Sequence, residues 1–131
     1  MSGIQRIHAG MSMMRRFMLV SLTLGAAVGA GAAELVFDIR IESGRAPENM
    51  RLVRVTQGDV VTLRWSTDRP VILHLHGYDI ERRVEPGQVV EMIFEARATG
   101  RFPVHGHAAG PQSGPSPREE PALVTIEVYP R

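Results

Sequence analysis

Hydrophobic and polar residues alternate with a period of two through much of the chain after residue 33. Apolar residues occupy every second position in four segments: Leu35 to Ile41, Val61 to Trp65, Val90 to Ala96 and Val124 to Val128. Side chains at positions i and i+2 of a strand point to the same face, so each segment has one apolar face. Turn-forming residues such as Gly58, Pro70 and the pair Pro86-Gly87 separate these segments. The pattern predicts an all-β fold, a single antiparallel Greek-key β-sandwich of seven to eight strands.

Residues 1–33 do not share this pattern and are predicted to be a secretory signal peptide. Arg15 and Arg16 precede an uncharged run from Phe17 to Ala33, which ends in small residues. A basic region, an apolar core and an A-x-A-like end are typical of a cleaved leader. We expect cleavage just before Ala33 or Glu34, and no stable membrane insertion afterwards. The folded domain then spans residues 34–131, and the protein is expected in the periplasm or outside the cell.

Removal of the leader changes the charge of the protein. The chain has 15 arginines and 14 acids, and three of the arginines lie in residues 1–33, so the remainder carries 12 arginines against 14 acids. This balance leaves no basic stripe for nucleic acid, which we exclude as a partner. The sequence contains no cysteine. Disulfides and any chemistry that needs a thiolate are therefore excluded as well.

Two His-x-His pairs stand out within strand-like segments. His74 and His76 end the run that begins at Val71, and His105 and His107 end the run that begins at Gly100. Each pair points to one face of its strand. Outside the predicted leader the chain has no other histidine, so its best metal ligands are concentrated at two places. A single pair is more often two partly exposed histidines, but two pairs favour a metal site.

These motifs, in this order, resemble those of the cupredoxin fold and, within it, of multicopper oxidases. The segment His74-Leu-His-Gly77 is similar to their His-x-His-Gly element. The segment from Gly100 to His107 is similar to their Gly-x-Tyr/Trp-x-x-His-x-His element. The resemblance implies a cupredoxin-like domain over 34–131 that binds copper through its four histidines. In the oxidases such pairs hold a three-copper cluster together with pairs from a second domain.

The chain departs from those oxidases at the ligands of a blue copper ion. The three expected ligand positions correspond to Val71, Gly106 and Pro111. Blue copper needs a His₂Cys set, and the remaining sulfur donors, Met50 and Met92, lie outside the ligand loop. Blue-copper electron transfer by this chain alone is therefore excluded. Gly106 is either the small residue that lets two histidines converge or a relic of the lost cysteine.

Four imidazoles suit a tetragonal Cu(II), a tetrahedral Zn(II) or a two- to three-coordinate Cu(I) ion, and affinity order favours copper over zinc. Asp79 and Glu81 are candidates for acceptors of the imidazole N–H groups. We predict copper binding at the end of the sandwich, with the Gly-, Pro- and Ser-rich loop 108–121 covering or opening the site. For Trp65, Phe102 and Tyr78 we expect packing roles, and for the pair Arg82-Arg83 an exposed face.

The expected function is periplasmic copper handling or delivery, with a metal ion as partner and another periplasmic or envelope protein as a possible recipient. Two alternatives remain open. One is an enzyme, an oligomeric multicopper-oxidase-like protein whose copper site is shared between subunits. The other is a metal-free interaction module, for which the histidines are incidental. Of these, a role without catalysis is favoured over an enzyme, because no residue pattern indicates a catalytic group.

Overall fold

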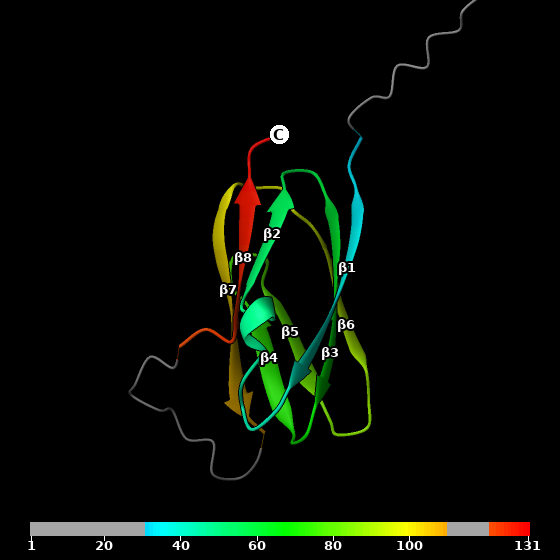
Figure 1. Ribbon diagram of the computed structural model, residues 1–131, viewed down its shortest axis with the longest axis vertical. Coiled ribbons are helices and arrows are strands. Elements are labelled where there is room, and N and C mark those ends of the chain that lie inside the picture. Colours follow the sequence, from blue (N-terminus) through cyan, green and yellow to red (C-terminus); the bar gives the residue numbers. More distant parts are fainter. Residues whose placement is uncertain (1–30, 110–120) are drawn as a thin grey trace, which may run out of the picture.

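The computed structural model describes residues 31–109 and 121–131, which form two β-sheets packed face to face (Figure 1). The strands are β1 (Glu34–Ile41), β2 (Leu52–Thr56), β3 (Val60–Thr67), β4 (Val71–Leu75), β5 (Ile80–Val84), β6 (Val90–Glu95), β7 (Gly100–Ala108) and β8 (Val124–Tyr129), and a short 3₁₀ turn, η1 (Glu48–Met50), precedes β2. One sheet has the order β1-β3-β6, and the other has the order β2-β8-β7-β4-β5. Most of the predicted leader and most of the predicted loop, residues 1–30 and 110–120, lie outside the described residues.

The predicted all-β sandwich is confirmed, and the structure adds the direction of each strand pair. β3 with β6, β4 with β5, β4 with β7 and β7 with β8 are antiparallel, as expected. β1 with β3 and β2 with β8 are parallel. The alternation of side chains along a strand shows which face is buried, but it carries no information about the neighbouring strand or its direction. For that reason the parallel pairs were not predicted.

The core lies between the two sheets and is built from the predicted apolar faces. Trp65 is fully buried, as expected, and Met92 is buried with it from the neighbouring strand. Tyr78 packs its ring against Phe94 and Phe102, with ring centroids 4.7 and 5.0 Å apart. The other large side chains with no exposed surface come from both sheets: Leu63, Leu73, Leu75, Ile126, Val61, Val84, Val104 and Val124. Their burial provides most of the free energy that favours folding.

The outer face of the five-stranded sheet carries the histidines. Val71, Leu73 and Leu75 of β4 are buried in the core, so Ile72 and His74 point to the opposite side. This corrects the expectation of a site at the end of the sandwich. β4 and β7 are direct neighbours, and their pairing aligns the two His-x-His motifs along the ladder of the sheet.

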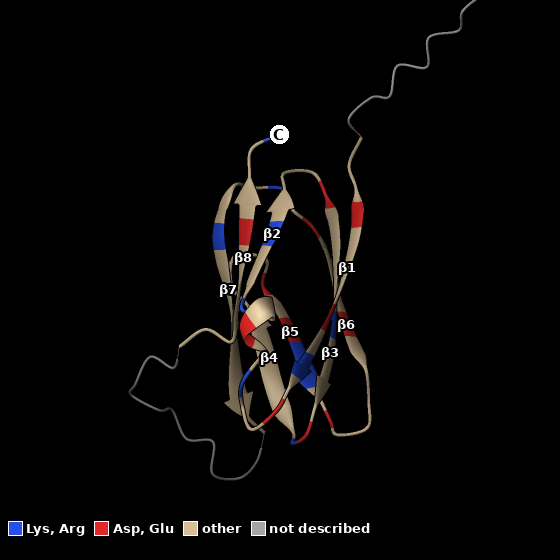
Figure 2. Ribbon diagram, in the orientation of Figure 1, with Lys and Arg blue, Asp and Glu red and all other residues tan. Residues whose placement is uncertain are grey.

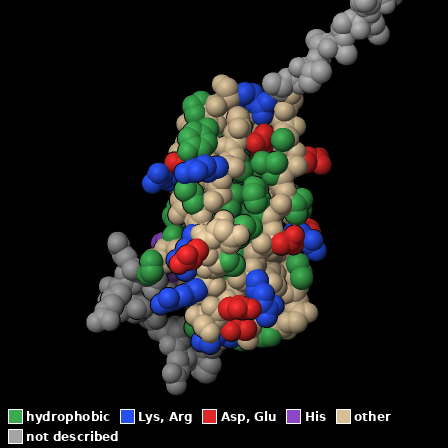
Figure 3. All heavy atoms as spheres, viewed as in Figure 1, with side chains coloured by type: hydrophobic (Ala, Val, Ile, Leu, Met, Phe, Trp, Pro, Cys, Tyr) green, Lys and Arg blue, Asp and Glu red, His purple; other side chains and the backbone are tan. Residues whose placement is uncertain are grey.

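Charged residues of both signs are spread over the strands and over the face shown in Figures 2 and 3. On the outer face of the five-stranded sheet, Glu127 of β8 contacts Arg54 of β2 at 3.3 Å and Arg101 of β7 at 3.1 Å. Such exposed ion pairs contribute little to stability, because solvent screens the two charges. Among the described residues, no helix has the length and apolar character needed to cross a membrane.

Candidate metal centre

The pairing of β4 with β7 brings the two His-x-His motifs side by side. His74 lies directly opposite His105, and Ile72 lies opposite His107. His76 follows the last residue of β4, and its backbone N–H donates to the carbonyl of Pro103 at 3.0 Å. This hydrogen bond extends the pairing of the two segments by one step. Three histidines from two segments distant in the sequence therefore share one small area of the sheet.

The rings of these three histidines are in contact. The centroids of His74 and His76 are 4.2 Å apart, and those of His76 and His105 are 4.8 Å apart. His76 is the middle ring of the three. Its Nε2 atom is fully buried and has no hydrogen-bond partner among the described residues. A buried polar atom without a partner costs about 1–3 kcal/mol, so this nitrogen is the one group of the cluster that lacks a partner it needs.

The surroundings of His76 keep its ring neutral. Burial lowers the pKa of His76 below its ordinary value, and the neighbouring His74, His105 and His107 lower it further, because a second positive charge there is repelled. A neutral imidazole is the form that binds a metal ion. The lowered pKa of His76 therefore favours the form of this ring that a ligand requires.

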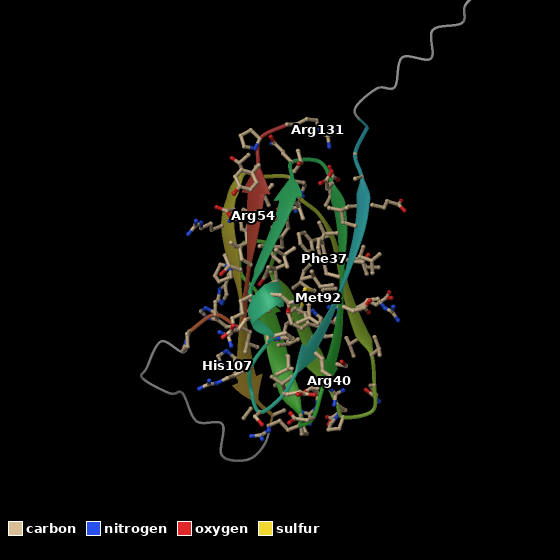
Figure 4. The ribbon with its side chains drawn as sticks, viewed as in Figure 1. Phe37, Arg40, Arg54, Met92, His107 and Arg131 are labelled. Carbon is tan, nitrogen blue, oxygen red and sulfur yellow. The ribbon has the colours of Figure 1, made fainter. Side chains whose placement is uncertain are left out.

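His107 is placed differently from the other three. It is exposed, and it lies two residues beyond His105 on β7, opposite Ile72. Figure 4 shows it on the lower part of β7, on the side of the molecule away from β1 and β3. The structure thus joins three of the four predicted ligands by ring contacts and leaves His107 at the edge of the cluster.

Both predicted acidic neighbours lie beside His74. Asp79 Oδ1 is 3.5 Å from His74 Nε2, and Asp79 has a fully exposed side chain and a positive φ of 54°. Glu81 is exposed too, and it lies opposite His74 in the pairing of β4 with β5. One cross-strand row therefore runs from His105 through His74 to Glu81 on the outer face of the sheet.

The donor set suits copper or zinc in its chemistry, but the side chains as they stand do not surround a common point. Within residues 31–109 and 121–131, no group of three or more His, Cys, Asp or Glu side chains has the arrangement that holds a metal ion. The rings of His74, His76 and His105 lie against one another at tilted angles of 51° and 66°. Binding a metal ion at this cluster therefore requires the rings to turn about their side-chain torsions.

Apolar side chains surround Gly106, the position that corresponds to the blue-copper cysteine. Gly106 faces the core, and a Cβ atom placed on it would lie 2.6 Å from Leu123 Cδ1 and 3.2 Å from Val71 Cγ2. Leu123 precedes β8, and its N–H donates to the carbonyl of Val104 at 2.9 Å. The hydrophobic pattern does not reveal this role of Leu123; its one signal is an apolar residue directly before Val124. A larger side chain at position 106 would therefore collide with Leu123.

The two methionines among the described residues give no alternative sulfur ligand at the cluster. Met92 is fully buried in the core, and Met50 is half-buried and packs against that core. Both therefore have packing roles. The imidazoles are the only strong nitrogen or sulfur donors of the described residues that gather on this face.

No family profile matches the chain, and no curated protein matches its sequence. Its structure, in contrast, matches solved structures. One is a heme-copper terminal oxidase dimer determined by cryo-EM, with a TM-score of 0.54, 15% identity, and coverage of 79% of this chain and 68% of that chain. The fold is cupredoxin-like. A multi-copper oxidase from Pseudomonas thermotolerans (TM-score 0.54, 18% identity) and a Cu-containing nitrite reductase from Thermus scotoductus (TM-score 0.54, 20% identity) also share this cupredoxin-like fold.

The cupredoxin-like domain of this chain corresponds to part of those last two enzymes. The match covers 77% of this chain and 31% of the oxidase, and 76% of this chain and 28% of the nitrite reductase. At these identities the similarity establishes the fold alone. The copper named for those two enzymes is a property of those enzymes. The case for a metal in this chain rests on its own histidines.

Proposed function

We propose that this chain is an exported copper-binding protein with a cupredoxin-like fold, and that it takes part in copper handling or delivery in the periplasm or outside the cell. Its ligands are His74, His76, His105 and His107. The fold holds the first three together, and His107 is the exposed fourth donor. Copper is the metal of choice because imidazole suits it and because Cu(II) binds such donors more tightly than Zn(II) does.

The observation that carries this proposal is the buried, unpartnered Nε2 atom of His76 between two other imidazoles. An apolar side chain at this position would avoid the cost of an unpaired polar atom, and the neighbouring imidazoles distinguish this nitrogen from the unpartnered polar atoms of Trp65 and Tyr78 in the core. A metal ion gives the lone pair a partner. The lowered pKa of His76 supports the same role, since a proton competes less with the metal.

The open position of the cluster favours delivery over permanent storage. His107 is exposed and the side chain of His74 is 30% exposed, so a partner protein can reach the ligands. Transfer between proteins needs such access, because the recipient's ligand must enter before the donor's ligand leaves. The strand β4, which carries His74, is an inner strand of its sheet and pairs with β7 and β5.

Copper titration of the exported protein, followed by optical and EPR spectra, tests this function. We expect binding with a nitrogen-rich, non-blue Cu(II) signal, and loss of that signal in the His74→Ala/His105→Ala variant. The control is Arg83→Ala, which changes an exposed side chain of β5 opposite Ile72 and leaves the histidines in place. Absence of binding, or binding that survives the double substitution, overturns the proposal and leaves a metal-free interaction module.

A second candidate, an oligomeric multicopper-oxidase-like enzyme, is supported by the same exposed face. Histidines on the outer face of a sheet can meet those of a second chain, which would complete a shared copper site. Oxygen consumption by the copper-loaded protein in the presence of a reductant, with a dimer or trimer by light scattering, would favour this enzyme. A copper-loaded monomer that consumes no oxygen favours delivery.

A further inference from the structure

Asp59 is a buried acid at the turn between β2 and β3, and it binds donors from three parts of the chain. Its side chain is 7% exposed. Oδ2 accepts from the N–H of Thr56 at 2.9 Å, and Oδ1 accepts from the N–H of Ala33 at 3.1 Å. Oδ1 also accepts from the guanidinium of Arg131 at 3.2 Å, and Figure 4 shows this arginine above the turn. Only Thr56 is near Asp59 in sequence, so the site exists only in the folded chain.

Ala33 is the first residue from the predicted leader side that the fold holds in place. In addition to its bond to Asp59, its carbonyl accepts from the N–H of Val60 at 2.9 Å. Glu34 then begins β1, where it pairs with Val60 of β3. Gly31 and Ala32, on the other side of Ala33, are exposed. The backbone of Ala33 is therefore hydrogen-bonded to the sandwich on both sides, although the residue lies outside its strands.

These contacts distinguish the two cleavage positions that the sequence leaves open. Cleavage between Ala33 and Glu34 would remove both hydrogen bonds of Ala33, leaving the buried Asp59 with one donor fewer. Cleavage between Ala32 and Ala33 would keep both. The residues before that bond, Ala30-Gly31-Ala32, also form an A-x-A sequence, which leader-cleaving enzymes prefer.

We propose that a leader-cleaving endopeptidase hydrolyses the bond between Ala32 and Ala33, and that the new amino terminus of Ala33 binds Asp59 as an ammonium group. Water adds across the peptide bond. The carboxylate of Ala32 leaves with the leader, and the nitrogen of Ala33 is released as an amine that takes up a proton. The product is a buried ion pair in place of an amide hydrogen bond.

The gain from processing follows from the change of donor. The amide of Ala33 already donates to a charged carboxylate, and an ammonium donor adds the attraction between two opposite charges. Arg131 opposes part of this gain, because its guanidinium shares Oδ1 of Asp59. The exposed carboxylate of Glu34 is the next charge along the chain. The carboxylate of Asp59 therefore favours the protonated form of the new amine. None of this depends on metal binding.

The absence of lysine makes the test selective. The sequence has no lysine, so the terminal amine is the only primary amine of the processed protein. The full chain of 131 residues is exported from a bacterial host, and the product is identified by intact mass and terminal sequencing. Its amine is then labelled by reductive methylation with ¹³C-formaldehyde and titrated by NMR. We expect a product that begins at Ala33, with an amine pKa higher than that of an equally labelled Asp59→Asn variant.

The controls separate a specific pair from a general charge effect. Asp38→Asn removes an exposed acid of β1, whose partner is Arg64, and leaves the amine pKa unchanged. Arg131→Gln removes the competing cation and raises the amine pKa, which keeps the test decisive if Asp59→Asn does not fold. A product that begins at Glu34 or keeps its leader overturns the proposal. So does an amine pKa that responds to neither Asp59→Asn nor Arg131→Gln.

Discussion

His74 and His105 lie directly opposite each other in the antiparallel pairing of β4 with β7, and both point away from the core. Residues opposite each other in such a pair have Cβ atoms about 5 Å apart. Two imidazoles at that spacing can both reach one metal ion, whose bonds to nitrogen are about 2 Å long. His76 follows the end of β4, and its ring contacts the rings of His74 and His105. It is the third member of the group. The cross-strand pair is therefore the base of the proposed copper site.

The position of His76 between two rings predicts an order of importance among the ligands. His76→Ala should weaken copper binding by more than about tenfold. Removing a residue that only supports a metal ligand already costs about tenfold in affinity, and His76 is a proposed ligand itself. His107→Ala should have a smaller effect, because His107 is exposed at the edge of the cluster. Competition titration with a copper chelator measures both values. Equal losses in the two variants would contradict this order.

The lowered pKa of His76 predicts that the metal-free protein loses stability in mild acid. The folded state resists protonation of this ring, so the unfolded state binds more protons. Stability is therefore full above the ordinary histidine pKa of about 6.5 and falls as the pH drops below it. Thermal unfolding between pH 7.5 and 5 measures the slope. His76→Gln should flatten the slope, whereas Arg83→Ala, which changes an exposed side chain outside the histidine cluster, is the control and should keep it. A slope unchanged by His76→Gln would count against the assignment.

The contact between Gly106 and Leu123 predicts a loss of stability when a methyl group is added. A Cβ atom on residue 106 would lie 2.6 Å from Leu123 Cδ1, so Gly106→Ala overpacks the space beneath the histidines. Such overpacking typically costs about 1–3 kcal/mol. Urea unfolding measures the cost. In the double variant Gly106→Ala/Leu123→Ala, the loss should be smaller than the sum of the two single losses, because the two residues share one space.

Gly77 predicts a link between backbone conformation and the metal site. Its φ is +88°, and a Cβ atom there would lie 2.5 Å from Phe102 Cδ1. Gly77→Ala should therefore cost about 2 kcal/mol or more, from backbone strain and overpacking together. It should also weaken copper binding, because His76 is the preceding residue.

Gly44→Ala is the matched control for this substitution. Its φ is +75°, but an added Cβ atom meets nothing within 4 Å. It therefore isolates the cost of the backbone conformation. Copper affinity should be unchanged in Gly44→Ala, as judged by the same chelator competition. If the two variants were equally stable and bound copper equally well, the proposed role of Phe102 packing would be wrong.

The sequence by itself determined the strands, their buried faces and the pairing of the histidines on common faces. These features depend on side-chain alternation along one strand, which is local. The same reasoning placed Trp65 in the core. It also located the proposed donors, because residues i and i+2 of a strand must share a face. The resemblance to multicopper oxidases indicated that Val71, Gly106 and Pro111 stand where blue-copper ligands are expected.

Only the tertiary structure decided which strands are neighbours and which face of the sheet the histidines occupy. The contact of His76 with His105 depends on the pairing of β4 with β7, segments about 30 residues apart. The packing of Leu123 over Gly106 and the binding of Ala33 and Arg131 by Asp59 are contacts of the same kind. Alternation within a strand is compatible with many arrangements of the strands. The arrangement that forms is the one in which the two sheets bury their apolar faces together, and this depends on contacts between distant segments.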